Sequence, residues 1–228
     1  MSDNDLTEPS NKNPNIGLIQ IPKSTNNSIN TYLEKNNSNI IPINIQSHLN
    51  IPNILKKIHG ILFIYDFEHI ENSLAPAEDE LKDFLIKCIQ ANKPILCTGY
   101  GLQILNSCLG GLNPISTPSH SSNNKESSYH RIFISPGSKL ASILGSGGFV
   151  RINSRHSYSI TETQKSSNFI ASAYSLDDGI IEAIESTEDV YIIAVQFNPE
   201  IRGEMPPHFD KLFTSLIKAC KKTQNSVY

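Results

Sequence analysis

A short glycine-containing turn between an apolar run and a helix-like segment constrains the fold more than any other stretch of this chain. The apolar residues 95–97 follow Lys93-Pro94 and are typical of a buried strand. The turn, residues 98–103, reads Thr-Gly-Tyr-Gly-Leu-Gln, and apolar side chains then recur at helical spacing until Gly110-Gly111. A buried strand, a sharp turn and a helix form the geometry of a nucleophile elbow, in which a strained turn raises one side chain above a sheet.

The patterns before this turn alternate between strand-like and helix-like segments. Apolar runs over residues 16–21, 40–45 and 61–64 predict buried strands, and residues 28–35 predict a first helix. Residues 76–92 predict the clearest helix, because apolar side chains recur at helical spacing after a proline and three acidic residues. This alternation indicates an α/β fold with a mostly parallel central sheet that is flanked by helices.

From His130 onward the patterns favour strands, so we expect a strand-rich C-terminal half. An amphipathic helix over residues 209–221 follows the last strand-like run. The Ser- and Asn-rich residues 116–128 predict a flexible loop, for which low-complexity filler is favoured over a binding element, although both interpretations stay open. The expected strands cover residues 131–135, 149–153, 169–174, 180–186 and 191–196.

Length and composition bound the domain count and the kinds of partner. The 228 residues suit a single domain, expected over residues 15–222, after a polar stretch over residues 1–14 that predicts a disordered tail. A net charge of -3 gives no reason to expect nucleic acid or an anionic membrane. No signal peptide or bilayer-length apolar run is visible, which favours the cytoplasm. We expect no cofactor and no metal, because the four cysteines lack ligand spacing and no nucleotide-binding glycine motif is present.

The turn resembles the catalytic elbow of the class I glutamine amidotransferases, most closely that of their γ-glutamyl-hydrolase-like branch, the peptidase C26 family. Their elbow reads Gly-Ile/Val-Cys-x-Gly-x-Gln. In this chain Gly101, Gln103 and the Gly110-Gly111 pair fit that spacing when the nucleophile is placed at position 99, which is Gly99. If Cys97 is aligned with the nucleophile instead, Gly101 falls at the Gln position, and the spacings to Pro94 and to Gly110-Gly111 no longer fit the family. The resemblance therefore implies that the nucleophile is missing.

A second family signature is similarly altered. Residues 194–200 read Ala-Val-Gln-Phe-Asn-Pro-Glu and resemble the Val-Gln-Phe-His-Pro-Glu that supplies the His and Glu of a Cys-His-Glu triad. Asn198 stands in the place of the histidine, and Glu200 is retained. Because an amide nitrogen cannot take a proton from a thiol, general-base activation is lost.

A third difference from the family's motifs lies earlier in the sequence than these two. Residues 59–64 resemble the strand that leads to the family's Pro-Gly-Gly, whose backbone amide helps to stabilise the oxyanion, and Tyr65 and Asp66 stand at the two glycine positions. A carboxylate there opposes the charge that should be stabilised, although the backbone amide itself could survive. The Tyr65 ring could fill the pocket, which we treat as a hypothesis.

Further matches extend the resemblance over roughly residues 15–220. Residues 152–156 are similar to Val-Asn-Ser-x-His, with His156 at the histidine, and residues 178–185 nearly match Asp-Gly-x-Ile-Glu-Ala-Ile-Glu. The resemblance implies a flavodoxin-like, class I glutamine amidotransferase fold. It also implies a pseudoenzyme related to the γ-glutamyl hydrolases, with a pocket at the carboxyl ends of the parallel strands.

Such a pocket implies a glutamine- or γ-glutamyl-type small molecule as ligand, with a protein partner or homo-oligomer as another possibility. The candidate binding residues are Tyr65, Asp66, Tyr100, Gln103 and His156. For His156 a binding role and a structural role are about equally expected, whereas for Gln103 a structural role is favoured. The retained Glu200 could serve as a hydrogen-bond partner of a ligand amine or of the backbone, or it could be a remnant without a role, and both interpretations stay open.

The alternative function is an active γ-glutamyl amide hydrolase whose machinery has moved. Cys97 is the rescue nucleophile, with His156 or Asp66 as further replacements. A buried structural cysteine is the favoured interpretation of Cys97, because no histidine stands at the base position to lower its pKa. A third possibility is a subunit that only packs against another protein.

Overall fold

One nine-stranded sheet organises the molecule. The computed structural model describes residues 13–21, 28–45, 49–66, 75–121 and 126–225. Five parallel strands run in the order β2 (Asn39–Pro42), β1 (Asn15–Ile21), β3 (Gly60–Tyr65), β4 (Ile95–Gly99) and β11 (Ile192–Val195). The sheet continues antiparallel through β10 (Ile181–Ser186), β9 (Phe169–Ser175), β6 (Ser128–Ile134) and β7 (Gly148–Ser154). A small second sheet pairs β5 (Ile115–Ser116) with β8 (Tyr158–Ser159).

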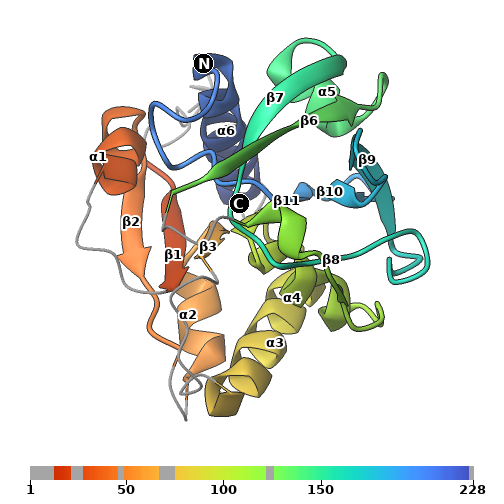
Figure 1. Ribbon diagram of the computed structural model, residues 1–228. Helices are drawn as coiled ribbons and strands as arrows, with labels where there is room; N and C mark the ends of the chain where they lie inside the picture. Colours follow the sequence, from red (N-terminus) through yellow and green to blue (C-terminus); the bar gives the residue numbers. More distant parts are fainter. Residues whose placement is uncertain (1–12, 22–27, 46–48, 67–74, 122–125, 226–228) are drawn as a thin grey trace, which may run out of the picture.

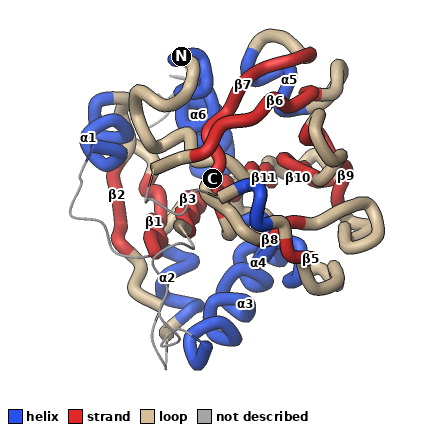
Figure 2. Tube along the Cα trace, viewed as in Figure 1, coloured by secondary structure: helices blue, strands red, loops and turns tan. Residues whose placement is uncertain are grey.

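Helices cover both faces of this sheet, as Figures 1 and 2 show. One group gathers at the bottom of the view in Figure 1 and comprises α2 (Ile51–Lys57), α3 (Ala75–Gln90) and α4 (Gly101–Cys108). The other group comprises α1 (Ser28–Lys35), α5 (Lys139–Leu144) and α6 (Lys211–Asn225). Two short 3-10 helices, η2 (Pro118–His120) and η3 (Pro207–Asp210), complete the described elements. Among the described residues, no helix is long and apolar enough to cross a membrane.

The core has two halves because alternate strand residues face opposite sides of a sheet. On β3, Leu62 and Ile64 join the cluster packed against α1, α5 and α6, whereas Phe63 and Tyr65 join the cluster packed against α2, α3 and α4. Every residue of β3 is buried, as expected for a central parallel strand. The prediction of an α/β fold with a mostly parallel sheet and a strand-rich C-terminal half is therefore confirmed.

Several predicted boundaries shift, and some short elements are additional. The second strand ends at Pro42 rather than at residue 45, although the Ile43 amide still donates to the Leu18 carbonyl of β1 at 2.8 Å. The pattern also missed α2, which begins after Asn50, whose side chain accepts a hydrogen bond from the Asn53 amide. The predicted tail over residues 1–14 lies almost wholly outside the described residues.

The expected loop over residues 116–128 has more structure than its composition suggests. It contains η2, it reaches β6 at Ser128, and the His120 side chain is 4% exposed. Residues 122–125 within it lie outside the described part of the chain. The expectation of a flexible loop therefore does not hold for residues 118–120, where His120 is buried, whereas the choice between filler and a binding element stays a prediction.

Candidate functional site

The turn after β4 has the backbone geometry of a nucleophile elbow. Gly99 is the last residue of β4 and has a φ of +61°, and α4 begins two residues later at Gly101. Glycine adopts this left-handed region without the steric cost that a Cβ brings. The chain therefore keeps the strained conformation of an elbow at a position that carries no reactive side chain.

The three positions of the predicted triad lie in a row. A Cβ added at Gly99 would lie 3.1 Å from Nδ2 of Asn198. That same Nδ2 donates a hydrogen bond of 2.8 Å to Oε1 of Glu200. Asn198 is held by Asn153, because the Asn198 amide donates to Asn153 Oδ1 at 3.0 Å and Asn153 Nδ2 donates to the Asn198 carbonyl at 3.0 Å. The ends of β4 and β11 thus bring together Gly99, Asn198 and Glu200.

The backbone of Tyr65 closes the position where a nucleophile would stand. Its carbonyl oxygen accepts a hydrogen bond of 2.9 Å from the Tyr100 amide, the amide that follows the elbow residue. A Cβ at Gly99 would overlap this oxygen. The Tyr65 ring packs with the rings of Phe63 and Tyr100, at centroid distances of 5.8 and 5.1 Å. The space next to position 99 is therefore filled by the Tyr65 carbonyl rather than by its ring.

Asp66 carries the second backbone amide that an oxyanion site would need, but this amide is already hydrogen-bonded. Its backbone amide donates to the Ile21 carbonyl at 2.8 Å, which extends the pairing of β3 with β1. Its carboxylate lies 3.5 Å from Nε of Arg155. Because the amides of Tyr100 and Asp66 are both engaged with backbone carbonyls, neither is directed at a substrate.

Glu200 carries a carboxyl group that is enclosed by protein. Burial raises its pKa to about 7, and the charge of Asp66 adds to the increase, while the hydrogen bond from Asn198 opposes it. In a triad a histidine at position 198 would supply the neutralising charge. Asn198 donates a hydrogen bond but carries no charge, so the carboxyl group holds its proton to an unusually high pH.

Cys97 is fully buried within β4, two residues before Gly99. It belongs to the cluster packed against α3 and α4, and its side chain is 0% exposed. A Cβ added at Gly101 would lie 3.2 Å from the Cβ of Cys97 and 3.2 Å from the Phe63 ring. Burial raises the pKa of the Cys97 thiol well above its usual value. These features are those of a structural cysteine rather than of a nucleophile.

Two of the candidate binding residues are engaged within the protein. Gln103 is 3% exposed, and its Nε2 donates to the Tyr158 carbonyl and to Oε1 of Gln196. His156 is also 3% exposed, and its Nδ1 lies 3.2 Å from the Tyr158 carbonyl and 3.1 Å from Oγ of Ser159. Tyr65 is 6% exposed, which leaves Asp66 and Tyr100 as the half-buried members of the group.

A buried histidine cluster adjoins this region, and only His156 among its members was a candidate site residue from the sequence. His120, His130 and His156 surround Glu182, whose side chain is 0% exposed. The four residues come from η2, β6, the segment after β7, and β10, so no local spacing unites them. The near-match to the family over residues 178–185 and the singling out of His156 were the available signals. Among the described residues, His120, His156 and Glu182 form the group with three metal-ligand atoms within 4.8 Å of one another.

Burial and mutual contacts shift the pKa values of Glu182, His120 and His130 in this cluster. Burial raises the pKa of Glu182, but the interactions with His130 and His156 outweigh burial and bring the pKa to about 2. Burial lowers the pKa of His120, and the neighbouring His156 lowers it further. For His130 burial opposes the charge, yet the hydrogen bond that its ring donates to Glu182 raises the net pKa. The cluster is thus built around a carboxylate that stays ionised, with a neutral His120 beside it.

A groove of about 570 Å³ lies at the opposite end of the sheet. Its lining includes Asn92 and Pro94 before β4, and Val190 and Tyr191 before β11. The elbow and the triad positions lie at the carboxyl ends of these same strands. The groove is therefore separate from the candidate site.

Fold and elbow together define a class I glutamine amidotransferase-like protein. The chain superposes on a protein described as part of the GMP synthase of Thermoplasma acidophilum with a TM-score of 0.71, at 14% identity over 94% of this chain and 97% of that one. It superposes on the glutaminase domain of CTPS from Trypanosoma brucei, solved with bound acivicin, with a TM-score of 0.68, at 15% identity over 92% and 94% of the two chains.

Sequence comparison assigns the family. The peptidase C26 family model matches residues 25–200, and the chain belongs to the peptidase C26 family. The chain is 34% identical over 149 residues to the glutamine amidotransferase-like protein YvdE of Lactococcus lactis subsp. lactis (strain IL1403). The aligned region covers 60% of this chain and 58% of YvdE. The recognition of a class I glutamine amidotransferase-like chain is thereby confirmed.

Proposed function

We propose that this chain is a catalytically inactive member of its family, a pseudoenzyme that acts by binding rather than by hydrolysing an amide. The observation that carries the proposal is the Tyr65 carbonyl, which accepts the Tyr100 amide and occupies the space beside Gly99. Gly99 and Asn198 lack the thiol and the imidazole that a Cys-His-Glu mechanism requires. Nucleophile, base and oxyanion donors are thus all compromised together.

The size of these losses supports the same conclusion. Removing the nucleophile of a well-studied hydrolase lowers turnover by about 10⁶. Removing one oxyanion-hole donor lowers it by about 10² to 10³. These factors are not additive, but the loss of the nucleophile by itself would bring a typical turnover of about 10 s⁻¹ to about 10⁻⁵ s⁻¹.

The binding role itself is the wider part of the proposal. The two structural neighbours are named as pieces of larger enzymes, which makes a protein partner or a second copy of this chain a reasonable ligand. A glutamine- or γ-glutamyl-type small molecule is the other ligand class, with Asp66 and Tyr100 as its first contacts because Gln103 and His156 are buried. A cytoplasmic location belongs to the same proposal.

Amide hydrolysis by the purified chain tests the loss of catalysis. Glutamine and a γ-glutamyl amide are incubated with the wild type and with Cys97→Ala, and released ammonia or amine is measured against a protein-free blank. We expect both proteins to match the blank. Wild-type turnover that disappears in Cys97→Ala would instead establish the alternative, an active hydrolase with a relocated nucleophile.

An electrophilic glutamine analogue provides a second readout that does not need turnover. Intact-mass measurement after incubation reports whether any thiol has been alkylated. We expect no adduct on Cys97, because its thiol is buried and its pKa is raised. A stoichiometric adduct at Cys97 would contradict the pseudoenzyme proposal.

The double variant Gly99→Cys/Asn198→His tests whether the Tyr65 backbone blocks the site, in addition to the absence of a thiol and an imidazole. It supplies a thiol and an imidazole, but the Cβ at position 99 overlaps the Tyr65 carbonyl oxygen, which in the wild type accepts the Tyr100 amide. We expect no hydrolysis above the blank. A gain of turnover would show that the Tyr65–Asp66 peptide reorients readily and that only side chains were lost.

Thermal shift separates the two ligand classes. A rise in Tm with millimolar glutamine, absent with an equal concentration of alanine, supports the small-molecule form of the proposal. An unchanged Tm together with a defined oligomer or complex supports the protein-partner form.

A further inference from the structure

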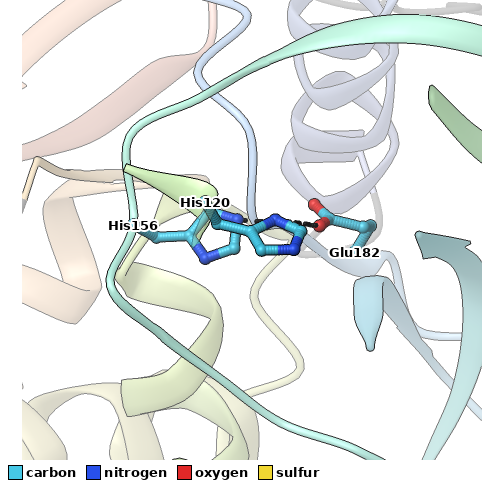
Figure 3. Close-up of side chains that lie close together, drawn as sticks. All are labelled: His120, His156 and Glu182. Atoms are coloured by element: carbon cyan, nitrogen blue, oxygen red, sulfur yellow. Dashed lines mark ion pairs between the residues drawn. The ribbon is translucent and has the colours of Figure 1, made fainter. Parts of the chain in front are cut away.

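Three buried side chains from distant parts of the chain point at one another beneath the segment after β7. His120 comes from η2, His156 from residues 155–157, and Glu182 from β10. Their side chains are 4%, 3% and 0% exposed. In Figure 3 the two imidazole rings lie side by side, and the dashed ion pairs converge on one oxygen of Glu182.

The hydrogen bonds of the two histidines leave one ring nitrogen of each directed inward. Nε2 of His120 lies 2.9 Å from Oδ2 of Asp178, and Nδ1 of His156 lies 3.2 Å from the Tyr158 carbonyl. A carboxylate and a carbonyl only accept hydrogen bonds, so these nitrogens carry the protons and donate. The opposite nitrogens, His120 Nδ1 and His156 Nε2, therefore keep their lone pairs.

Those lone pairs have no hydrogen-bond partner within the described part of the protein. His120 Nδ1, His156 Nε2 and Glu182 Oε2 are buried and make no hydrogen bond there. Buried polar atoms are ordinarily satisfied, because an unpaired one loses its contact with water without compensation. One ligand atom from each of His120, His156 and Glu182 lies within 4.8 Å of the other two, so a single electrophile among them could serve all three side chains.

The spacing and the outer contacts match those of a metal site. His120 Nδ1 and His156 Nε2 each lie 3.6 Å from Oε1 of Glu182. Ligands at about 2.0–2.1 Å from a tetrahedral zinc ion are separated by about 3.4 Å, so these two nitrogen–oxygen distances suit such an ion. A metal-bound histidine characteristically donates its other N–H to a carboxylate or carbonyl, as His120 does to Asp178 and His156 does to Tyr158.

We propose that His120, His156 and Glu182 bind one divalent transition-metal ion, with Zn²⁺ as the probe ion. Two imidazoles and one carboxylate form a donor set that suits Zn²⁺, with a fourth position left for water. His130 Nε2 lies 2.9 Å from Oε1 of Glu182 and positions the carboxylate.

The ion would tie η2 to β10 and to the strand segment beside the elbow. Oγ of Ser154 already donates to the His120 carbonyl at 2.6 Å. The preceding residue, Asn153, holds the backbone of Asn198 through two hydrogen bonds. The metal thus fixes the segment that positions Asn198, which gives the site a structural role.

Metal content of the purified full-length chain tests the proposal. The chain is stripped with a chelator, dialysed against limiting Zn²⁺, and analysed by elemental mass spectrometry. We expect about one zinc ion per chain in the wild type and less than about 0.1 in His120→Ala and in His156→Ala. The matched control is His208→Ala, which removes an exposed imidazole on η3 and should retain one ion.

Thermal unfolding gives a second readout. At a free Zn²⁺ concentration about 100-fold above Kd, the wild type should gain about 5–10 °C in Tm, and the two ligand variants should gain none. Asp178→Asn keeps all three ligands but removes the carboxylate acceptor of His120, so it should weaken zinc binding by about 10- to 100-fold.

Wild-type protein that holds less than about 0.1 equivalents and shows no Tm gain would overturn the proposal. The cluster would then be a network of histidines sharing a proton over Glu182. Retention of a full equivalent by the His120→Ala/His156→Ala double variant would overturn it equally. If the variants do not fold, Co²⁺ substitution of the wild type decides the matter: tetrahedral d–d absorption at one equivalent is expected, and its absence contradicts the site.

Discussion

Glu200 makes the stability of this protein fall as pH rises through neutrality. Its carboxyl group is enclosed beside Asn198, and burial raises its pKa to about 7 from an ordinary 4.5. Between those two pH values the folded chain binds a proton at Glu200 that the unfolded chain has released. The free energy of unfolding therefore decreases with increasing pH over this window.

The size of the effect follows from the two pKa values. Each pKa unit corresponds to about 1.4 kcal/mol, so bringing the charged carboxylate into the folded protein costs about 3 kcal/mol above pH 7. Glu200→Gln removes the titration and keeps an oxygen that accepts the hydrogen bond from Asn198 Nδ2. Relative to the wild type, Glu200→Gln should gain about 3 kcal/mol between pH 4 and pH 8.

Urea denaturation at several pH values measures this difference directly. All other titrating groups are common to both proteins and cancel in the comparison. Glu34→Gln, at an exposed position of α1, controls for the loss of one negative charge. Asn198→His supplies a cation next to Glu200 and should shrink the pH-dependent loss. A Glu200→Gln difference that stays constant from pH 4 to pH 8, or that changes in the opposite direction, would refute this account.

Two further pairs of substitutions test the elbow and the core. Gly99→Ala should destabilise the chain by more than about 2 kcal/mol, because the added Cβ brings left-handed strain and also overlaps the Tyr65 carbonyl oxygen. Its control, Gly203→Ala, has a φ of +90° with open space around it and should cost only about 1 kcal/mol. Equal losses in urea denaturation would contradict the closed-site geometry. Phe213→Ala, at 1% exposure on α6, should cost about 3–5 kcal/mol, and Phe149→Ala, at 73% exposure on β7, less than about 1 kcal/mol. A comparable Tm decrease in both would place the core elsewhere.

Much of the fold was accessible from local pattern. The elbow could be found because β4, Gly99 and α4 are neighbours in the chain, and the conformational preference of glycine is a local property. The β3 and β4 strands were recognisable because both are buried on two faces and read as continuous apolar runs. The proposed loss of the nucleophile and the base likewise depends on single residues at the spacings of a family motif.

Short elements and their ends were less accessible. The weakly patterned helix α2 depends on the cap at Asn50, and η2 depends on the burial of His120 by residues that are distant in sequence. Composition indicated filler over residues 116–128 because Ser and Asn carry little hydrophobic pattern. Packing nevertheless buries His120 within this segment.

Two decisive features of the site depend on tertiary structure alone. The Tyr65 carbonyl reaches the Tyr100 amide only because β3 and β4 pair in a register that sets Tyr65 opposite Gly99. The convergence of His120 and His156 on Glu182 joins three segments with no common spacing. The sequence by itself determined which residues stand at the elbow and at positions 198 and 200, since residue identity suffices for that. Where backbone groups point and which distant side chains share one buried space follow from strand register and packing, which only the folded chain decides.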